Sequence, residues 1–439
     1  MPTTNRGAPV TVLDRISDRR ARVVVIGQGY VGLVVAMRAS EAGFDVVGFE
    51  SDERRAARLA AGDSYVEDVP DEVLAAALRR GYRPTSDPAD IAGFDVGIIS
   101  VPTPLAEGLP DLSFVESASH LFAEYLRPDV LVILESTTYP GTTEELVRPI
   151  LEQGSGLEAG SDFLLGYSPE RIDPGNRQFG LHNTPKVVSG IDEASLAAVE
   201  AFFGSFVEAT VPVSGTGEAE LTKVLENTFR HVNVALVNEI AMFAHDLGID
   251  AAEAIDAAST KPFGYMRFTP GPGVGGHCLP IDPSYLSWRV KQHLGENFRF
   301  IELANDINEH MPAYVVRRVQ AMLNRDRKAV NGSRIVVLGL AYKPNVGDAR
   351  EAPSTPLIAR LLELGAEVVA VDPHVGDDYP NGAAARATEM TADLLADADA
   401  VVLVTDHDVW DYDLLVAAGV PVLDTRNRLP RGHEHIERL

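Results

Sequence analysis

Residues 22–32, RVVVIGQGYVG, decide the fold of the N-terminal part of this chain. The apolar run VVVI predicts a short buried strand, and Gly27, Gly29 and Gly32 follow it in the pattern GxGxxG. The next stretch, LVVAMRASEAG, predicts a helix that ends at a glycine. In such a turn the first glycine permits the bend, the second lets the backbone approach a pyrophosphate, and the third allows close helix–strand packing. The stretch therefore predicts a dinucleotide-binding turn.

An acidic residue, Glu50, ends the second predicted strand, DVVGFE. At this place a carboxylate can accept hydrogen bonds from both adenosine ribose hydroxyls and would repel a 2′-phosphate. We therefore predict NAD rather than NADP as the cofactor. Arg54 and Arg55 leave two interpretations open, because they either contact the ribose or adenine or lie on a solvated surface.

Further strand-like runs at 94–101, 130–136 and 162–168 alternate with helical patterns, as in a parallel, doubly wound sheet. From about residue 216 to 330, apolar residues recur at helical spacing, and Pro312 is the weak point of the last predicted helix. At RIVVLGLAYKP the opening pattern returns as a strand, a turn at Gly339 and a helix. The predicted fold class is α/β, with two Rossmann-like doubly wound domains joined by a central all-helical segment. The predicted boundaries are a loose polar N-terminal extension over 1–20, the first Rossmann domain over 21–215, the helical domain over 216–330 and the second Rossmann-like domain over 331–439.

The charge of the chain limits its partners. Its 64 acidic and 38 basic side chains give a formal charge of −26, which repels nucleic acid and anionic membranes. No run approaches the roughly 20 apolar residues of a membrane helix, and the N-terminus lacks the apolar core of a secretory signal. We expect a cytoplasmic protein with no nucleic-acid or membrane partner, in which a local Lys/Arg cluster holds any anionic substrate.

The chain has one cysteine, Cys278, so it forms neither an internal disulfide nor a multi-cysteine zinc site, and we predict no metal. A lone cysteine is commonly a small buried apolar residue. Here it lies in GPGVGGHCLPIDP, where dense glycines let backbone N–H groups and a ligand come close together. This context favours a reactive thiol, with the neighbouring His277 as a loop hydrogen-bonder rather than a base.

Lys223, Asn227 and Arg230 recur at i, i+4 and i+7 of a predicted helix, so all three share one face. Flanking apolar residues suggest that this segment is well buried. A lysine, an amide and an arginine together suit an oxyanion and a phosphate, whereas the ordinary alternative is a solvated face.

Five motifs carry a resemblance that runs from about residue 20 to the C-terminus. In this order, GxGxxG, ESTTYPGTTE, LTKVLENTFR, GPGVGGHCLPIDP and GLAYKPNVGDAREAPS resemble the UDP-glucose/GDP-mannose dehydrogenase family. SPERIDPGN and PGPGVGGHCLPIDP are most similar to the branch that acts on UDP-N-acetylhexosamines. The resemblance implies a four-electron oxidation by two NAD⁺, in which the C6 primary alcohol of UDP- or dTDP-glucose or of a UDP-N-acetylhexosamine becomes a uronic acid.

The resemblance also implies a role for each matching position. Cys278 attacks the intermediate aldehyde to form a thiohemiacetal, which is oxidised to a thioester. Lys223 serves as acid/base and stabilises oxyanions beside Asn227, and Asp282 orients water or the thiol. Thr137 and Glu170 hold and activate water, with Glu170 as the candidate base for thioester hydrolysis. The implied NAD contacts are Gly27, Gly29, Tyr30, Val31, Gly32, Glu50, Arg55, Thr103, Thr137 and Arg350. The implied sugar-nucleotide contacts are Glu170, Arg171, Ile172, Lys223, Asn227, Arg230, Phe268, Gly275, Tyr342, Lys343 and Arg426.

Two positions depart from the family pattern. Members acting on UDP-glucose commonly have an R-I-G segment whose arginine reaches the partner subunit's sugar, whereas this chain has KPFGYMRF, in which Lys261 and Arg267 are possible substitutes. Many members have a lysine where this chain has Ile281. Both departures fit the amino-sugar branch but leave the sugar open.

The predicted assembly is a homodimer through the central helices, with NAD in the first domain, the nucleotide sugar in the C-terminal domain and the active site in the cleft between them. Two other functions remain open. One is a two-electron hydroxyacid-type dehydrogenase of the same fold, and the other is a non-catalytic nucleotide-sugar sensor.

Overall fold

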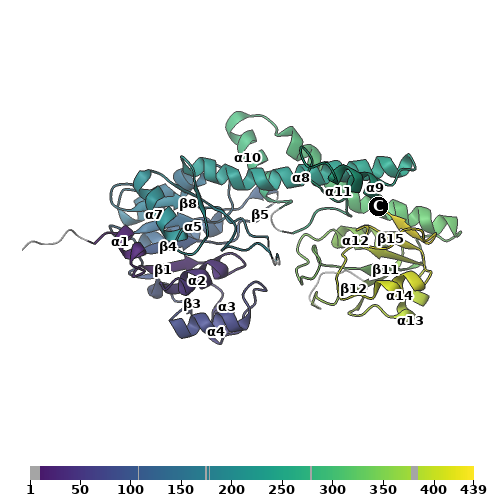
Figure 1. The fold of residues 1–439 in the computed structure, drawn as a ribbon, viewed down its shortest axis with the longest axis horizontal. Helices are drawn as coiled ribbons and strands as arrows, with labels where there is room; N and C mark the ends of the chain where they lie inside the picture. Colours follow the sequence, from purple (N-terminus) through teal and green to yellow (C-terminus); the bar gives the residue numbers. More distant parts are fainter. Residues whose placement is uncertain (1–9, 107, 174–175, 177, 277–278, 377–383) are drawn as a thin grey trace, which may run out of the picture. The chain divides into compact units, whose positions relative to one another are not determined.

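The computed structural model describes residues 10–106, 108–173, 176, 178–276, 279–376 and 384–439. The chain divides into two compact units, Met1–Glu226 and Asn227–Leu439, and the boundary falls within one helix, α8 (Thr216–Asp246). Each unit carries one large, predominantly parallel sheet covered by helices (Figure 1). The predicted α/β class with two Rossmann-like domains and a helical segment between them is confirmed.

The sheet of the first unit has the strand order β10-β9-β8-β7-β4-β1-β2-β3. Its strands are β1 (Arg22–Ile26), β2 (Asp45–Phe49), β3 (Arg83–Thr85), β4 (Val96–Ile99), β7 (Leu131–Leu134), β8 (Leu164–Tyr167), β9 (Lys186–Gly190) and β10 (Thr210–Pro212), and β5 (Leu105–Ala106) and β6 (Leu109–Pro110) form a separate hairpin. β1 pairs in parallel with both β2 and β4, which makes the carboxyl ends of these strands a switch point where ligands bind in such folds. The predicted parallel pairing holds from β3 to β8, but β9 runs antiparallel to β8.

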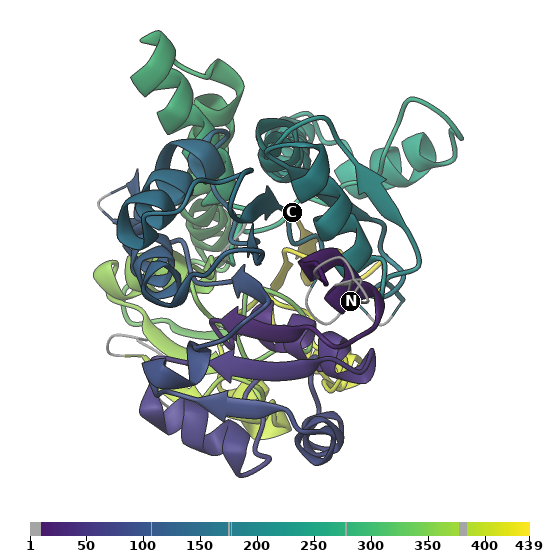
Figure 2. The ribbon, with the colours of Figure 1, turned by 90° about the vertical axis from the view of Figure 1, so that its left-hand side faces the viewer.

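Helices cover both faces of this sheet, as Figure 2 shows from the side of the first unit. They are α1 (Val12–Ser17), α2 (Gly32–Glu41), α3 (Glu53–Ala60), α4 (Asp71–Arg80), α5 (Ser113–Tyr125), α6 (Arg148–Ser155), α7 (Glu193–Phe203), the 3₁₀ turn η1 (Pro88–Ile91) and the π-helical turn η2 (Thr143–Val147). Val96 and Ile98 of β4 pack in one core cluster with α2 and α7. On the other face Gly97 lies against the Phe122 ring of α5.

The prediction of a loose extension before the first strand is wrong for residues 12–17, which form α1. Thr11 and Asp14 cap this helix reciprocally, each accepting a hydrogen bond from the other's backbone N–H. Val12 and Ile16, one turn apart, are buried in the core, and Arg15 forms ion pairs with Asp95 and Asp129. Two apolar residues on one face and a capping box are therefore enough to hold this short segment.

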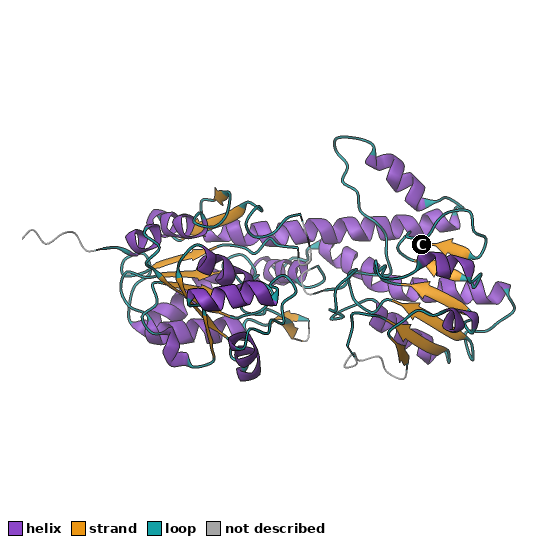
Figure 3. Cartoon of the chain, turned by 60° about the horizontal axis from the view of Figure 1, so that its bottom comes forward, coloured by secondary structure: helices purple, strands orange, loops and turns teal. Residues whose placement is uncertain are grey.

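The described part of the central segment after α8 contains only helices and loops (Figure 3). Its helices are α9 (Ala251–Ser259), α10 (Asp282–Leu294) and α11 (Arg299–Arg325). Pro312 lies inside α11 and does not end it, contrary to its expected weakness. Proline has no N–H, so the Asn308 carbonyl lacks the hydrogen bond that residue 312 would otherwise donate to it. This carbonyl lies beside Gly273 of the glycine-rich loop.

The C-terminal sheet is parallel throughout, in the order β13-β12-β11-β14-β15-β16. Its elements are β11 (Arg334–Leu338), α12 (Ser354–Glu363), β12 (Glu367–Val371), β13 (Ala385–Ala387), α13 (Ala392–Ala396), β14 (Ala400–Leu403), α14 (Tyr412–Ala417), β15 (Val422–Asp424) and β16 (Ile436–Arg438). Ile335 and Val337 of β11 pack with α11 and α12, and the alternate Val336 and Leu338 pack with α13 and α14. Burying each such side chain contributes about 1.5–3 kcal/mol. The helix predicted after the turn at Gly339 begins only at Ser354, because a long loop intervenes.

None of the helices in the described part of the chain has the length and apolarity needed to cross a bilayer.

Candidate active site

The glycine turn of the first unit has the geometry of a pyrophosphate cradle. Gly27 has φ +92°, and a Cβ built there would lie 2.2 Å from the Ser100 carbonyl oxygen. A Cβ on Gly32, the first residue of α2, would lie 2.0 Å from the Gly27 carbonyl oxygen. A Cβ on Gly29, in contrast, would meet no atom within 4 Å. The outer two glycines are therefore required by packing, while the middle one leaves open space beside a helix N-terminus, which fits a dinucleotide.

Glu50 stands directly after β2 and is held against this turn. Its carboxylate accepts hydrogen bonds from the backbone N–H groups of Gln28 at 3.3 Å and Asp52 at 3.1 Å, and the residue is buried. These bonds fix the carboxylate beside the glycine turn, and its contact with the ribose stays a prediction.

The two arginines after Glu50 differ in their surroundings. The Arg54 side chain is 92% exposed and pairs with Asp52, so it lies on the solvated surface. The Arg55 guanidinium lies 5.3 Å above the Tyr65 ring, and the Tyr65 hydroxyl donates to the Gln28 carbonyl at 2.8 Å. Tyr65, which sequence analysis did not single out, therefore links Arg55 to the glycine turn. Tyr30, Val31 and Thr103 are half-buried around the same turn and strand end.

Predicted catalytic side chains meet at the carboxyl ends of β7 and β8. Lys223 of α8 donates to the Glu170 carboxylate at 3.3 Å, and both side chains are nearly buried, with 7% and 9% exposed. Glu170 also accepts a hydrogen bond from the backbone N–H of Ile172. Thr137 follows β7, whose end lies beside that of β8, and is half-buried. The structure thus brings Glu170, Ile172 and Lys223 together within the first unit.

Arg171 points its guanidinium at Glu226 rather than standing free. The two form an ion pair at 2.6 Å, and Arg171 also donates to the Pro185 carbonyl at 2.6 Å. Any contact of Arg171 with a nucleotide sugar would have to share or replace these bonds.

Glu220 anchors α8 to the loop that follows Thr137. Its buried carboxylate accepts from the Gly141 N–H at 2.5 Å, the Thr143 N–H at 2.8 Å and the Thr143 hydroxyl at 2.6 Å. Burial raises the pKa of Glu220 to about 7, although these hydrogen bonds oppose the shift. An acid one turn before Lys223 was not predicted as functional, since only the folded chain shows its donors.

In the second unit, Asn227 donates to the Asp282 carboxylate at 2.5 Å, and both residues are buried. Asp282 begins α10 directly after the glycine-rich loop. The structure therefore joins two of the predicted catalytic residues. Cys278 and His277 lie outside the described residues, so their predicted roles stay predictions.

The glycine-rich loop packs on the predicted nucleotide-binding residues of the C-terminal domain. A Cβ on Gly275 would lie 2.8 Å from the Tyr342 Cβ, and one on Gly271 would lie 3.0 Å from an Arg426 guanidinium nitrogen. Arg426 is further held by donating to the Val404 carbonyl at 2.6 Å. Gly275 thus lies against Tyr342, and Gly271 of the same loop lies against Arg426. Lys343 follows Tyr342 as a half-buried residue.

Three other predicted contacts lie at the surface or near it. Arg230 is exposed, so the expectation of a well-buried face holds for Lys223 and Asn227 but not for Arg230, which lies on a more outward part of α8. Arg350 is 54% exposed and pairs with Asp348 at 2.6 Å. Phe268 is half-buried, with its ring 5.8 Å from that of Phe229.

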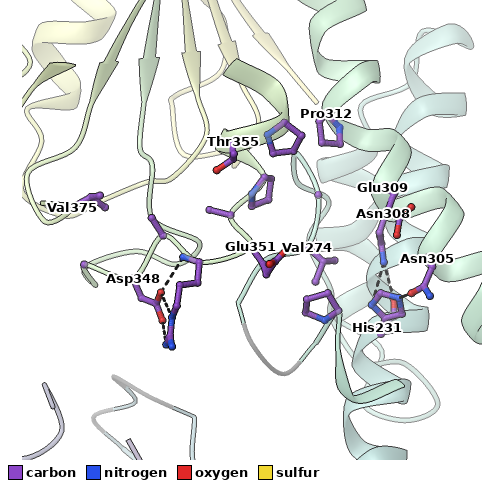
Figure 4. A pocket seen from close by; sticks show the side chains of 18 of the residues that line it. His231, Val274, Asn305, Asn308, Glu309, Pro312, Asp348, Glu351, Thr355 and Val375 are labelled. Carbon is purple, nitrogen blue, oxygen red and sulfur yellow. Dashed lines mark hydrogen bonds and ion pairs between the residues drawn. The ribbon is translucent and has the colours of Figure 1, made fainter. Parts of the chain in front are cut away.

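A pocket of about 800 Å³ adjoins the glycine-rich loop within the second unit. Residues of α8, α11 and the loop before α12 line it, and Figure 4 shows His231 hydrogen-bonded to Asn305 and Asn308 on its wall. Burial lowers the pKa of His231. Arg350 and Glu351 belong to the same lining, so this pocket borders the predicted ligand-contacting loop.

Asp372 follows the second strand of the C-terminal sheet, as Glu50 does in the first unit, but its hydrogen-bond partners differ. It accepts from the backbone N–H groups of Leu340 at 2.7 Å and Ala341 at 3.0 Å, and His407 bonds to it at 3.0 Å. Burial alone would raise the pKa of Asp372, but the hydrogen bonds from His407 and Leu340 lower it below its ordinary value. This acid therefore secures its own glycine turn from inside the domain.

Family models match three successive parts of the chain. The NAD binding domain of the UDP-glucose/GDP-mannose dehydrogenase family matches residues 21–207, the central domain 217–310 and the UDP binding domain 336–431. A UDP-N-acetyl-D-mannosamine dehydrogenase of Pyrococcus horikoshii is 37% identical over 389 residues, which cover 88% of this chain and 89% of the relative. The chain belongs to the UDP-glucose/GDP-mannose dehydrogenase family.

A second relative and a solved structure are similar to this chain over most of its length. A UDP-N-acetyl-D-glucosamine 6-dehydrogenase of Pseudomonas aeruginosa is 38% identical over 357 residues, 81% of this chain and 83% of the relative. A solved structure of UDP-D-ManNAc dehydrogenase from P. horikoshii superposes with a TM-score of 0.87 and 33% identity, covering 95% of this chain and 98% of that one. The predicted family is confirmed, and so is NAD as the cofactor. This family member is an NAD-dependent nucleotide-sugar dehydrogenase.

Proposed function

We propose that this dehydrogenase oxidises the C6 primary alcohol of a UDP-N-acetylhexosamine to the uronic acid, consuming two NAD⁺ for each substrate. The observation that carries the proposal is the buried Lys223–Glu170 ion pair, which places an ammonium and a carboxylate 3.3 Å apart at the carboxyl edge of the sheet. The two relatives that are 37% and 38% identical bear the names of dehydrogenases of UDP-amino sugars, which supports that sugar class.

The glycine turn and Glu50 would hold NAD⁺, which would supply the hydride acceptor for both oxidations. Lys223 acts in this step as the neutral amine, which takes the proton of the C6 hydroxyl as the aldehyde forms and becomes the ammonium. The Cys278 thiol then adds to the aldehyde carbon, forming the C–S bond of a thiohemiacetal that keeps the aldehyde on the protein. The second oxidation removes another hydride and a proton from this adduct and leaves a thioester.

Thioester hydrolysis releases the product. Glu170 takes a proton from water as the water oxygen attacks the thioester carbon, and Thr137 orients that water. The C–S bond breaks, the carboxylate leaves and the Cys278 thiol is restored. Lys223 and Asn227 stabilise the negative oxygen that develops in each tetrahedral state, and Asp282 orients Asn227 through their 2.5 Å hydrogen bond.

We further propose that residues 21–215 bind NAD, that residues 331–439 bind the nucleotide, and that residues 216–330 form a homodimer. Phe229, Leu236, Ile240 and Phe243 are 43–60% exposed at helical spacing on the second-unit part of α8. Such a stripe is typical of a helix that packs against another chain.

NADH formation with a panel of nucleotide sugars tests the proposed function. UDP-N-acetylglucosamine, UDP-N-acetylmannosamine, UDP-glucose, dTDP-glucose and GDP-mannose are compared, and two NADH are expected per UDP-amino sugar consumed. One NADH per substrate would favour the hydroxyacid-type alternative, and failure of every sugar nucleotide to reduce NAD⁺ would favour the sensor.

Substitution of the thiol tests the covalent route. Cys278→Ser is expected to lower uronate formation by more than about 10³-fold while NAD still binds, because the hydroxyl is a far weaker nucleophile. Near wild-type uronate formation by this variant would exclude the thioester.

A further inference from the structure

A buried ion pair joins the two segments that carry Thr137 and Glu170. The Lys186 ammonium bonds to a Glu135 carboxylate oxygen at 2.6 Å and donates to the Pro169 carbonyl at 3.0 Å. The side chains are 2% and 0% exposed, and the ammonium lies 4.7 Å from the Phe203 ring centre. One cation thus connects the ends of β7 and β8 from inside the protein.

The antiparallel course of β9 puts Lys186 there. β7 and β8 are parallel and end at the same edge of the sheet, whereas β9 begins at that edge because it runs in the opposite direction. Tyr167 pairs with Ser189 and Gly166 with Gly190, so the same register, continued outward, sets Lys186 opposite Glu170. Lys186 is therefore the first residue of β9 and also a neighbour of the predicted base.

A contribution to folding stability does not by itself explain why the Lys186–Glu135 pair is buried. Removing two charges from water costs several kcal/mol for each ion, and apolar replacements of such pairs are often neutral or stabilising. The Glu135 carboxylate also interacts electrostatically with Glu170 of the candidate site. Burial raises the pKa of Glu135 and the charge of Glu170 raises it further, while Lys186 opposes both effects.

We propose that Lys186, together with Glu135, is a positioning residue for Glu170. Pro169 directly precedes Glu170, so holding the Pro169 carbonyl fixes the backbone from which the carboxylate reaches Lys223. Glu135 in turn anchors the Lys186 ammonium and leads into Thr137. This inference rests on the proposed role of Glu170 as the base of thioester hydrolysis, and it adds residues outside that chemistry to the apparatus that orients it.

The test compares Lys186→Met with the double variant Glu135→Met/Lys186→Met. The single change leaves Glu135 without its cation and is expected to lower the melting temperature, whereas the double change is expected to restore it. Both variants should show kcat lowered by about 10- to 100-fold, because a small misplacement of a reacting group is costly. The KM values for NAD and nucleotide sugar should stay within about 2-fold, since neither group binds them.

Lys328→Met is the matched control. Lys328 pairs with Asp399 at the same 2.6 Å but is 48% exposed and belongs to the second unit. This variant should keep wild-type kcat. A double variant that recovers both melting temperature and kcat would show a purely structural pair and overturn the proposal.

Hydrogen exchange at the Ile172 amide gives a readout that needs no activity. This N–H donates to Glu170, so its exchange should accelerate at least about 10-fold in both Met variants and not in Lys328→Met. Unchanged exchange would overturn the proposal even if the wild-type protein oxidised no sugar nucleotide. The substrate panel with the wild-type protein separately decides the proposed function, so the two failures are distinguishable.

Discussion

At the scale of single residues, the surroundings of Glu170 are set by the strand end that precedes it and by Lys223 of α8. Glu170 follows β8, and its carboxylate meets an ammonium from α8 at 3.3 Å in surroundings with little solvent. A carboxylate held in this way can accept a proton from water while the neighbouring cation stabilises the developing oxyanion.

Replacing this carboxylate should separate oxidation from hydrolysis. Glu170→Gln keeps the shape of the side chain but removes the base, so kcat should fall by about 10²–10⁴-fold. The thioester should then accumulate, and intact-protein mass spectrometry should detect the added nucleotide sugar. Glu158→Gln, an exposed position in the same unit, should behave like the wild type. Slow turnover without a trapped adduct would argue against Glu170 as the hydrolytic base.

Glu50 supports a second prediction at this scale. Glu50→Gln removes the negative charge that the Gln28 and Asp52 N–H groups hold beside the turn. NAD affinity should fall by about 10-fold, and the preference for NAD over NADP should narrow, because the repulsion of a 2′-phosphate is lost. Titration calorimetry with both cofactors measures these changes against Glu53→Gln, an exposed residue of α3. An unchanged ratio of the two affinities would mean that Glu50 does not select the cofactor.

Among the elements, α8 carries three of the candidate site residues, Lys223, Asn227 and Arg230. Within the first unit it is joined to the Gly141–Thr143 turn by Glu220, one turn before Lys223. The folded state holds the proton of Glu220 more tightly than the unfolded state does, because burial raises its pKa from 4.5 to about 7.

The stability contributed by protonated Glu220 is present below about pH 4.5 and is lost as pH rises through about 7. Relative to Glu220→Gln, which does not titrate, the wild-type free energy of unfolding should therefore decline by roughly 3 kcal/mol across this window. Urea unfolding at several pH values measures the difference. Glu218→Gln, on an exposed part of α8, should parallel the wild type at every pH. A difference independent of pH would show that Glu220 does not titrate in this range.

At the scale of the whole molecule, the proposed homodimer would bury the exposed apolar side chains of α8 against a second copy of the chain. Leu236 and Phe243 are 51% and 60% exposed there. Leu236→Glu/Phe243→Glu should convert the proposed homodimer to a monomer, because it would place charges in an apolar interface. Light scattering after gel filtration gives the mass. Phe114→Glu, 47% exposed on α5, should stay dimeric. A monomeric wild-type protein, or a double variant that still dimerises, would contradict the proposed interface.

Local signals in the sequence were sufficient for the parts of the fold that depend on neighbouring residues. The glycine turn, the strand that precedes it and Glu50 lie within 29 residues and need no distant partner to be recognised. Family motifs added the remaining candidate residues, including the pairs Lys223–Glu170 and Asn227–Asp282. Their pairing could not be read from spacing, since the partners of each pair are more than 50 positions apart.

The sequence by itself determined the alternation of strands and helices, the NAD turn and the family, because hydrophobic periodicity and glycine conformations are local properties. Only the tertiary structure decided that β9 runs antiparallel, and with it that Lys186 reaches Glu135 and Pro169. It likewise decided that Pro312 stays within α11 and that Glu220 meets its three donors. Strand direction and the partners of a buried charge are set by packing between segments that are distant in the sequence. The local pattern of residues contains no information about that packing.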